Sequence, residues 1–370
     1  MAIDEERNDT RGSGMATEPV QIDEAKAAEF LGKVTGDYAG AMTTVLTLIG
    51  DQLGLFKELA ENGSANSEQL AERAGIDERY AREWLHGMHA SGYLTTDDGG
   101  FALPVEHQLV FAQEGGPMFM GGFYEEFYAL LAVVPKVIES FKTGGGVPQS
   151  DYPQQFWNGR RRGTAGWHGN LLVQQWIPAV PEVKEKLEAG CRYADVGCGQ
   201  GLAVIRLAQA FPESTFVGYD AFEGQIAGAE ELARQEGVAD RVRFEVRDVA
   251  QGLDEKFDVI STFDVVHDAV DPVGLLKGIR SGLADDGHYL LLDMNCADDP
   301  VENQGPLAAL FYGFSIGYCM TTSLASGGAG LGTCGLPPAK ARELTQEAGF
   351  SSCEKLPLEN PFNNLFDVTR

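Results

Sequence analysis

Short apolar runs alternate with amphipathic segments along the second half of the chain. Five runs typical of buried strands stand at residues 192–196, 215–219, 242–246, 258–263 and 288–293. Helical patterns lie between them at residues 202–211, 225–236 and 273–283. This alternation predicts an α/β fold built on a parallel, doubly wound sheet. Two closing strands, 352–356 and 365–369, are expected to form a hairpin at the sheet edge and bring it to seven strands.

The first half of the chain has a helical pattern instead. Helices are expected within residues 24–60, and the uncharged stretch 39–49 indicates a helix buried on most of its sides. Asn66 and Asp77 stand where they would cap two further helices, and a hairpin is expected at residues 93–103. Three helices followed by a hairpin describe a winged helix.

These patterns divide the chain into four parts. The order is a flexible polar leader, an amino-terminal helical winged-helix domain, a helical bridge and an α/β domain, at residues 1–22, 23–115, 116–190 and 191–370. The regular alternation breaks after the fifth strand, where residues 295–335 hold an expected helix and a glycine-rich run. Because this insertion follows the carboxyl end of a strand, it is placed where a lid would lie.

The acidic net charge of the chain bears on which macromolecules it can bind. The net charge is −27, and a surface this acidic repels phosphate backbones and anionic membranes. Residues 61–100 alone carry eight acidic side chains and three arginines, which is the wrong sign for a DNA-contacting winged helix. A dimerisation or lid module is the favoured interpretation of that domain, with neither nucleic acid nor membrane as partner.

Cysteines and apolar runs bear on the compartment. The six cysteines form no CxxC pair, so neither a metal site nor a disulfide framework is predicted. The leader lacks the apolar core of a signal peptide, and the longest apolar run, residues 307–320, has 14 residues and is too short to span a bilayer. A cytoplasmic protein with reduced thiols is expected.

A glycine loop follows the first strand of the sheet. Gly197, Gly199 and Gly201 alternate between that strand and the next helix, so the backbone can turn tightly and approach a ligand. In a dinucleotide-binding pattern the third glycine would fall on Leu202 instead. The loop therefore predicts a nucleoside cofactor without naming it.

Three aspartates narrow the cofactor further. Asp195 precedes the loop and can meet an ammonium group, Asp220 ends the second strand and can hold both ribose hydroxyls, and Asp248 can accept from an adenine amine. Acidic groups suit a cationic ligand without phosphate. S-adenosylmethionine is such a ligand and a dinucleotide is not.

At these residues the sequence resembles the class I S-adenosylmethionine-dependent methyltransferases. The resemblance covers roughly residues 191–370 and rests on the segment from Asp195 to Gly201, on Asp220 and Asp248, and on the end of the fourth strand with Phe263 and Asp264. It implies a seven-stranded, Rossmann-like methyltransferase sheet in which all these residues bind the cofactor, with S-adenosylhomocysteine as product.

A narrower resemblance includes the amino-terminal domain. A winged helix before such a core is similar to small-molecule O-methyltransferases, including the plant enzymes, and to a mycobacterial group of uncharacterised methyltransferases. The stretch Asp264-Val-Val-His267-Asp268-Ala-Val-Asp271 is similar to the plant Leu-His-Asp-Trp-Ser-Asp motif, which implies His267 as general base and a homodimer formed by the amino-terminal domain. Asp268 or Asp271 could orient the ring, or an acid from elsewhere. Ala269 stands where the plant motif has Trp.

Other functions stay open at this point. The acceptor could be a small molecule with a hydroxyl, or one with a thiol or an amine that needs no base. The chain could instead be an S-adenosylmethionine-sensing transcription regulator or an NAD-dependent oxidoreductase. Aromatic and methionine side chains at residues 117–128, with Phe156, Trp157 and Trp167, suggest a largely apolar acceptor pocket.

Overall fold

The computed structural model describes residues 21–358 and 360–370, so nearly all of the predicted leader lies outside the described residues. The chain divides into two units at Val45 and Leu46, which are described separately. The first unit holds most of helix α1 (Glu24–Gln52). Its apolar side chains include Phe30, Val34 and Tyr38, all exposed in the single chain.

The expectation of a helix buried on most of its sides at residues 39–49 is wrong for this chain alone. Met42 is 51% exposed, Val45 45% and Ile49 41%. These positions recur at helical spacing, so they form an apolar stripe along the helix. An uncharged apolar helix indicates that another surface covers it, but the sequence does not identify that surface.

The winged helix is present in the second unit. It comprises α2 (Leu55–Asn62), α3 (Ser67–Ala74), α4 (Glu78–Ala90), the strands β1 (Thr95–Asp97) and β2 (Gly100–Ala102), and α5 (Val105–Phe111). Asn66 caps α3 as predicted: its side chain accepts from the Gln69 N–H at 2.9 Å, and the Gln69 side chain accepts from the Asn66 N–H at 2.9 Å. Phe56, Trp84 and Leu85 are buried in its core.

A set of helices joins the winged helix to the sheet. They are α6 (Gly121–Leu131), α7 (Val134–Thr143), the short η1 (Gln149–Asp151), α8 (Gln154–Trp167), the π-helical η2 (His168–Trp176) and α9 (Pro181–Ala189). Glycines let α6 and α8 approach closely, because a Cβ on Gly122 would lie 2.2 Å from the Gly163 nitrogen and one on Gly159 would lie 2.4 Å from the Glu126 nitrogen. This approach places polar side chains of both helices within reach of each other.

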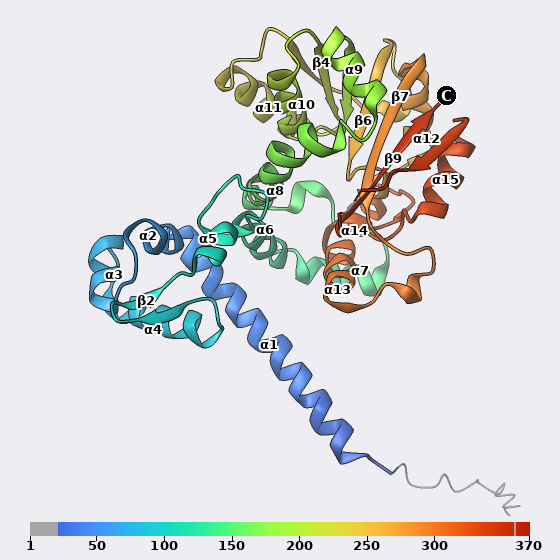
Figure 1. Cartoon of the computed structure of the whole chain (residues 1–370). Helices are drawn as coiled ribbons and strands as arrows, with labels where there is room; N and C mark the ends of the chain where they lie inside the picture. Colours follow the sequence, from blue (N-terminus) through green and yellow to red (C-terminus); the bar gives the residue numbers. More distant parts are fainter. Residues whose placement is uncertain (1–20, 359) are drawn as a thin grey trace, which may run out of the picture. The chain divides into compact units, whose positions relative to one another are not determined.

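The predicted seven-stranded sheet is confirmed, with strand order β5-β4-β3-β6-β7-β9-β8 (Figure 1). Its strands are β3 (Arg192–Val196), β4 (Thr215–Asp220), β5 (Val242–Val246), β6 (Phe257–Phe263), β7 (Leu283–Met294), β8 (Ser352–Lys355) and β9 (Asn363–Thr369). The first five of these are parallel, and β9 runs antiparallel between β7 and β8. The carboxyl ends of five parallel strands therefore meet along one edge.

Helices cover both faces of the sheet, as the alternating pattern predicts. One core is formed with η2, α9, α10 (Leu202–Ala210) and α11 (Glu223–Gln235). The other is formed with α12 (Pro272–Gly282) and α15 (Pro338–Glu347). The strands β3, β4, β6 and β9 are buried along most of their length, which explains their apolar character, whereas the edge strands β5 and β8 carry exposed residues.

The insertion after β7 is more helical than its sequence suggests. The short η5 (Pro300–Glu302) precedes α13 (Gly305–Phe314), the π-helical η6 (Ser315–Cys319) and α14 (Met320–Ala325), which follow one another without a break. By length and hydropathy alone, Gly305–Ala325 is the one unbroken described helix that could cross a membrane. Phe311, Tyr318 and Cys319 are nevertheless buried within the fold, as core helices of this kind often are.

Candidate active site

The glycine loop lies between the carboxyl end of β3 and the start of α10. Gly197, Gly199 and Gly201 have φ angles of 73°, 53° and 74°, in the left-handed region that favours glycine. A Cβ on Gly197 would lie 2.6 Å from the Val265 side chain, whereas a Cβ on Gly199 would point into open space. The backbone at Gly199 is therefore the part of the loop that a ligand can approach.

Asp220 ties this loop to the neighbouring strand. At the end of β4, its Oδ2 accepts from the Gly199 N–H and its Oδ1 from the Phe222 N–H, both at 2.9 Å. Burial raises the pKa of this carboxyl, although the two N–H groups act in the opposite direction. The carboxylate thus lies where the sequence places a ribose ligand, beside the open part of the loop.

Asp195 lies beneath the loop and is 2% exposed. It accepts a hydrogen bond from the Ser261 hydroxyl at 2.7 Å. Burial raises its pKa to about 7, and the nearby Asp220 adds to the rise. A buried carboxylate of this kind favours a cationic neighbour, because a positive charge would offset its cost.

Asp248 follows β5, one strand further along the same edge. It is exposed, and its side chain accepts from the Ala250 N–H at 3.0 Å, so it caps the short η3 (Val249–Gln251). The structure thus gives Asp248 a local structural role beside the predicted ligand role.

Phe263 and Asp264 end β6 in different ways. The Phe263 ring packs against Trp176 and His168, each with centroids 5.7 Å apart. Asp264 has a φ of 58°, the one positive value among the described non-glycine residues, and accepts from the Asn363 amide at 2.7 Å. Burial raises its pKa to about 7, and Asp293 adds to the rise. The strand therefore ends in a sharply turned backbone that a second chain segment holds.

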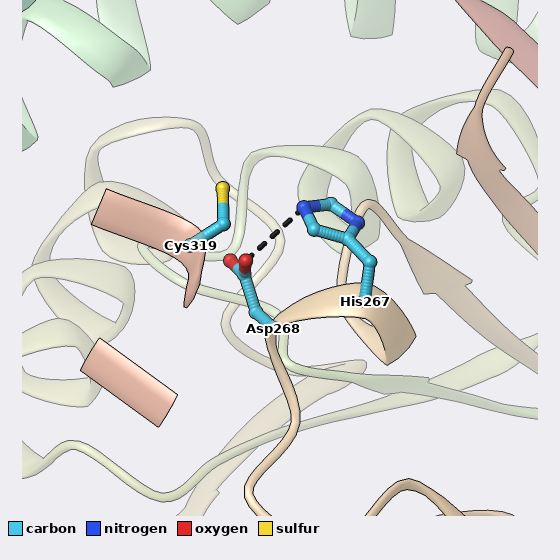
Figure 2. A group of neighbouring side chains, drawn as sticks. All are labelled: His267, Asp268 and Cys319. Atoms are coloured by element: carbon cyan, nitrogen blue, oxygen red, sulfur yellow. Dashed lines mark ion pairs between the residues drawn. The ribbon is translucent and has the colours of Figure 1, made fainter. Parts of the chain in front are cut away.

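His267 lies in the short η4 (Val266–Asp268) after β6 and is 1% exposed. Its Nδ1 donates to Oδ1 of Asp293 across 2.6 Å, and its Nε2 lies 3.1 Å from Oδ1 of Asp268 (Figure 2). Burial works against a charge on the ring, but the two carboxylates outweigh it and hold the pKa of His267 well above its usual value. The imidazole is wedged between two acids.

The orienting acid of His267 is Asp293, which sequence reasoning missed. Asp293 ends the apolar part of β7 and is fully buried, and its Oδ2 lies 3.4 Å from the His267 backbone nitrogen. Of the two suggested candidates, Asp271 instead caps α12 by accepting from the Gly274 N–H at 2.8 Å. The signal was available: a carboxylate closing an apolar strand is the same pattern that singles out Asp195.

Cys319 approaches the same group from the insertion. Its sulfur, a His267 nitrogen and an Asp268 oxygen all lie within 4.8 Å of one another (Figure 2). Cys319 closes the π-helical turn η6, and π-turns are frequent at functional sites. Burial raises the pKa of this thiol, and Asp268 adds to the rise.

A partly buried ion pair borders this cluster. Arg160 on α8 donates from Nε to Oε1 of Glu126 on α6 across 2.8 Å, and its guanidinium lies 4.6 Å from the Tyr318 ring centroid. Arg162 pairs with Asp51 at 2.9 Å. Arg160 and Arg162 thus make their ion pairs within one chain.

A cavity of about 520 Å³ opens beside the carboxyl end of β7. It is lined mainly by the insertion and its neighbours, with Asn295, Cys296, Asp298 and Phe311 among the lining residues. Polar side chains are prominent in this lining, and none of the aromatic residues predicted to line the acceptor pocket belongs to it, so that prediction stays open.

Two family descriptions match the chain. A methyltransferase domain matches residues 187–313, and an Rv2258c-like winged helix-turn-helix domain matches residues 41–113. These matches confirm the predicted combination of a winged helix with a methyltransferase domain, and with it the predicted class of enzyme.

Solved structures share the fold, and curated proteins match part of the sequence. An O-methyltransferase family protein from Burkholderia thailandensis has a TM-score of 0.68 at 16% identity, over 92% of this chain and 98% of its own. Human N-acetylserotonin methyltransferase in complex with S-adenosylmethionine has a TM-score of 0.66 at 16% identity, over 95% of this chain and 99% of its own. The ubiquinone biosynthesis O-methyltransferase of Ruegeria pomeroyi is 32% identical over 111 residues, which are 30% of this chain and 44% of that protein. The chain spans less than two thirds of the length of the curated relatives that it matches.

Proposed function

We propose that this chain, a methyltransferase with an Rv2258c-like winged helix-turn-helix domain, transfers the methyl group of S-adenosylmethionine to a hydroxyl of a small molecule. The single observation that carries the proposal is the loop held by Asp220, whose carboxylate lies beside open backbone at Gly199. Relatives named as O-methyltransferases support the choice of a hydroxyl acceptor.

The cofactor supplies an electrophilic methyl group on a sulfonium. The chain binds it with the backbone of Gly197, Gly199 and Gly201, with Asp220 on the ribose hydroxyls, and with Asp248 on the adenine amine. Asp195 offers its buried carboxylate to the cationic end, and its raised pKa fits a site that favours positive charge. Phe263 and Asp264 complete this side of the site at the end of β6.

Acceptor activation falls to His267 as general base. Asp293 fixes the ring through Nδ1, which leaves Nε2 as the atom that can take a proton from a hydroxyl. In the structure Nε2 faces Asp268, which favours the charged ring, so Nε2 must release its proton and the acceptor must take the place of that contact before the ring can act as base. Asp293 is a positioning residue, since it acts through the ring.

Acceptor acidity tests the base role. Turnover is measured as S-adenosylhomocysteine released with a panel of phenols of decreasing pKa. His267→Ala should lower turnover by about 10²- to 10⁴-fold on weakly acidic phenols, and by less on acidic ones that ionise unaided. An equal loss across the panel would remove the base role while leaving methyl transfer in place.

Two alternatives have distinct signatures. Transfer to a thiol or amine needs no base, so turnover on such acceptors would survive His267→Ala. An S-adenosylmethionine-sensing regulator would bind DNA in a salt-dependent way, and an electrophoretic shift assay would detect it. The acidic balance of residues 61–100 speaks against that regulator.

A homodimer in the cytoplasm belongs to the same proposal. The apolar stripe on α1 continues towards the helix start through Phe30, Val34 and Tyr38, and a second copy of the chain would bury this surface. All six cysteines are free, which suits a reducing compartment. Light scattering on the full chain tests the dimer, and a monomer at micromolar concentration would contradict it.

A further inference from the structure

We propose that His267, Asp268 and Cys319 form a binding site for one soft divalent cation such as Zn²⁺. The proposal that a metal binds here is argued only from the geometry of these three residues. Its consequence, inhibition of methyl transfer, rests on the proposed role of His267 as base.

The fold brings the three ligands together from two segments. His267 and Asp268 are adjacent in η4, after β6, and Cys319 closes the π-helical η6 of the insertion. One ligand atom from each lies within 4.8 Å of the other two, and Figure 2 shows the imidazole and the sulfur on either side of the carboxylate. Zinc bonds of about 2.0 to 2.3 Å would place ligand atoms about 3.3 to 3.6 Å apart, so rotamer adjustments of about 1 Å complete the site.

The donor set is one that zinc accepts. Imidazole nitrogen, carboxylate oxygen and thiolate sulfur are its three usual protein ligands, and three ligands leave a fourth position for water. A carboxylate and a thiolate together cancel the charge of a divalent ion, which removes the main cost of burying it.

Asp293 completes the arrangement behind the ring. A metal-bound histidine usually donates its other N–H to a carboxylate, which fixes the tautomer and makes the ligand more basic. The Nδ1 of His267 donates to the buried Asp293 at 2.6 Å, so Nε2 is the nitrogen directed at Asp268 and Cys319. The Asp268 Oδ1 is buried and, apart from its 3.1 Å contact with Nε2, has no hydrogen-bond partner among the described residues.

An ion pair between His267 and Asp268 is the simpler interpretation of the same atoms. It explains the 3.1 Å contact without a metal, and the Cys319 thiol then only donates a hydrogen bond to the Asp268 carboxylate. The two interpretations differ in one measurable way: only a metal site makes the cysteine a ligand.

Bound metal would stop base catalysis at this site. The Nε2 lone pair, which would otherwise take the proton of the substrate hydroxyl, would bind the cation instead. Because the thiol and the imidazolium must release protons on binding, affinity should rise with pH.

The test uses the full chain, stripped with a chelator and titrated with Zn²⁺ by calorimetry and with Co²⁺ by absorption. We expect one ion per chain and a thiolate-to-cobalt charge-transfer band. Cys319→Ser should remove the band and weaken Zn²⁺ binding at least about tenfold, and Asp268→Asn should weaken it as well. The matched control is Cys353→Ser on β8, which should keep both signals, and circular dichroism checks that each variant is folded.

The competing thiols are tested directly. The Cys296 thiol lies 3.4 Å from the Cys334 carbonyl oxygen, so these two cysteines could capture metal by themselves. Binding lost in Cys334→Ser but kept in Cys319→Ser would overturn the proposal, as would the absence of a thiolate band in the wild-type chain.

Activity gives a separate outcome. Saturating Zn²⁺ should lower wild-type turnover and a chelator should restore it, while the turnover that remains in Cys319→Ser should not respond. Unchanged or increased turnover in the wild type would overturn the inhibitory role. A chain that binds metal through Cys319 but transfers no methyl group would contradict the proposed function and leave the metal site supported.

Discussion

Replacing Asp220 by alanine tests the cofactor site most directly. The two oxygens of this carboxylate each accept one backbone N–H, from Gly199 and Phe222, both at 2.9 Å. An ionised carboxylate offers about four lone-pair sites, so about two remain for ligand hydroxyls. Asp220 can therefore hold the loop and both ribose hydroxyls at the same time.

The magnitude follows from those two ligand hydrogen bonds. A hydrogen bond to a charged group contributes about 1.5 to 3 kcal/mol, so two give about 3 to 6 kcal/mol. Water that fills the space of the missing side chain replaces part of these hydrogen bonds, so we expect the binding free energy of the cofactor to weaken by about 3 kcal/mol. That corresponds to a Kd for the cofactor raised about 100-fold.

Loss of folding is not expected to confuse the result. Burial raises the pKa of Asp220, so the ionised carboxylate is costly in the unliganded fold and its removal does not lower stability on that account. Gly199 faces open space, where water can take over its N–H. The thermal midpoint without ligand should therefore stay close to that of the wild type.

The assay is calorimetric titration of the purified chain with S-adenosylmethionine and with S-adenosylhomocysteine. Asp240→Ala is the matched control, because Asp240 is an exposed acid in the loop before β5. Weakening of less than about threefold by Asp220→Ala, in a folded chain, would refute the ribose assignment. Equal weakening by Asp240→Ala would point to the net charge of the chain instead.

Three further predictions concern two ion pairs and one glycine of the cofactor loop. Glu126→Gln leaves Arg160 without its buried partner and should lower the free energy of unfolding by about 3 kcal/mol, measured with urea. The hydrogen bond to Asp367 raises the pKa of His288, so this pair stabilises the fold fully below the unfolded histidine value of about 6.5 and less as pH rises through the raised value. His288→Gln should therefore lose about 1 kcal/mol at pH 6 and progressively less at high pH, seen in urea unfolding at both pH values. Gly197 has a φ of 73°, and a Cβ there would lie 2.6 Å from a valine side chain. Gly197→Ala should therefore lower the free energy of unfolding by at least about 1 to 2 kcal/mol and weaken cofactor binding, measured by thermal unfolding and calorimetry.

The sheet could be predicted because its signals are local. The inner strands are buried on two faces and form apolar runs in the sequence. Each helix carries its own hydrophobic period, so the strands and the helices between them can be predicted from neighbouring residues. The loop glycines can also be predicted locally, because few residues other than glycine adopt a left-handed backbone conformation. Asn66 caps its helix as predicted for the same reason.

The insertion was harder to predict, because its packing depends on distant elements. Its helical stretch extends to Ala325, beyond the apolar run in the sequence, through a π-turn that has no clear sequence signal. Only in the folded chain does that turn bring Cys319 to His267. The glycine contacts that bring Glu126 to Arg160 likewise join residues 34 positions apart.

By itself, the sequence determined the order of the elements, the glycine loop and the carboxylates that end the strands, because each depends on a residue and its close neighbours. The tertiary structure alone decided which of those carboxylates serves the histidine. Asp293 is 26 positions from His267, and a parallel sheet brings the two together only when β6 and β7 pair. It also decided that the apolar stripe of α1, read in the sequence as a buried helix, is exposed in a single chain. Hydrophobic patterning shows that a surface is apolar, whereas only packing shows what covers it.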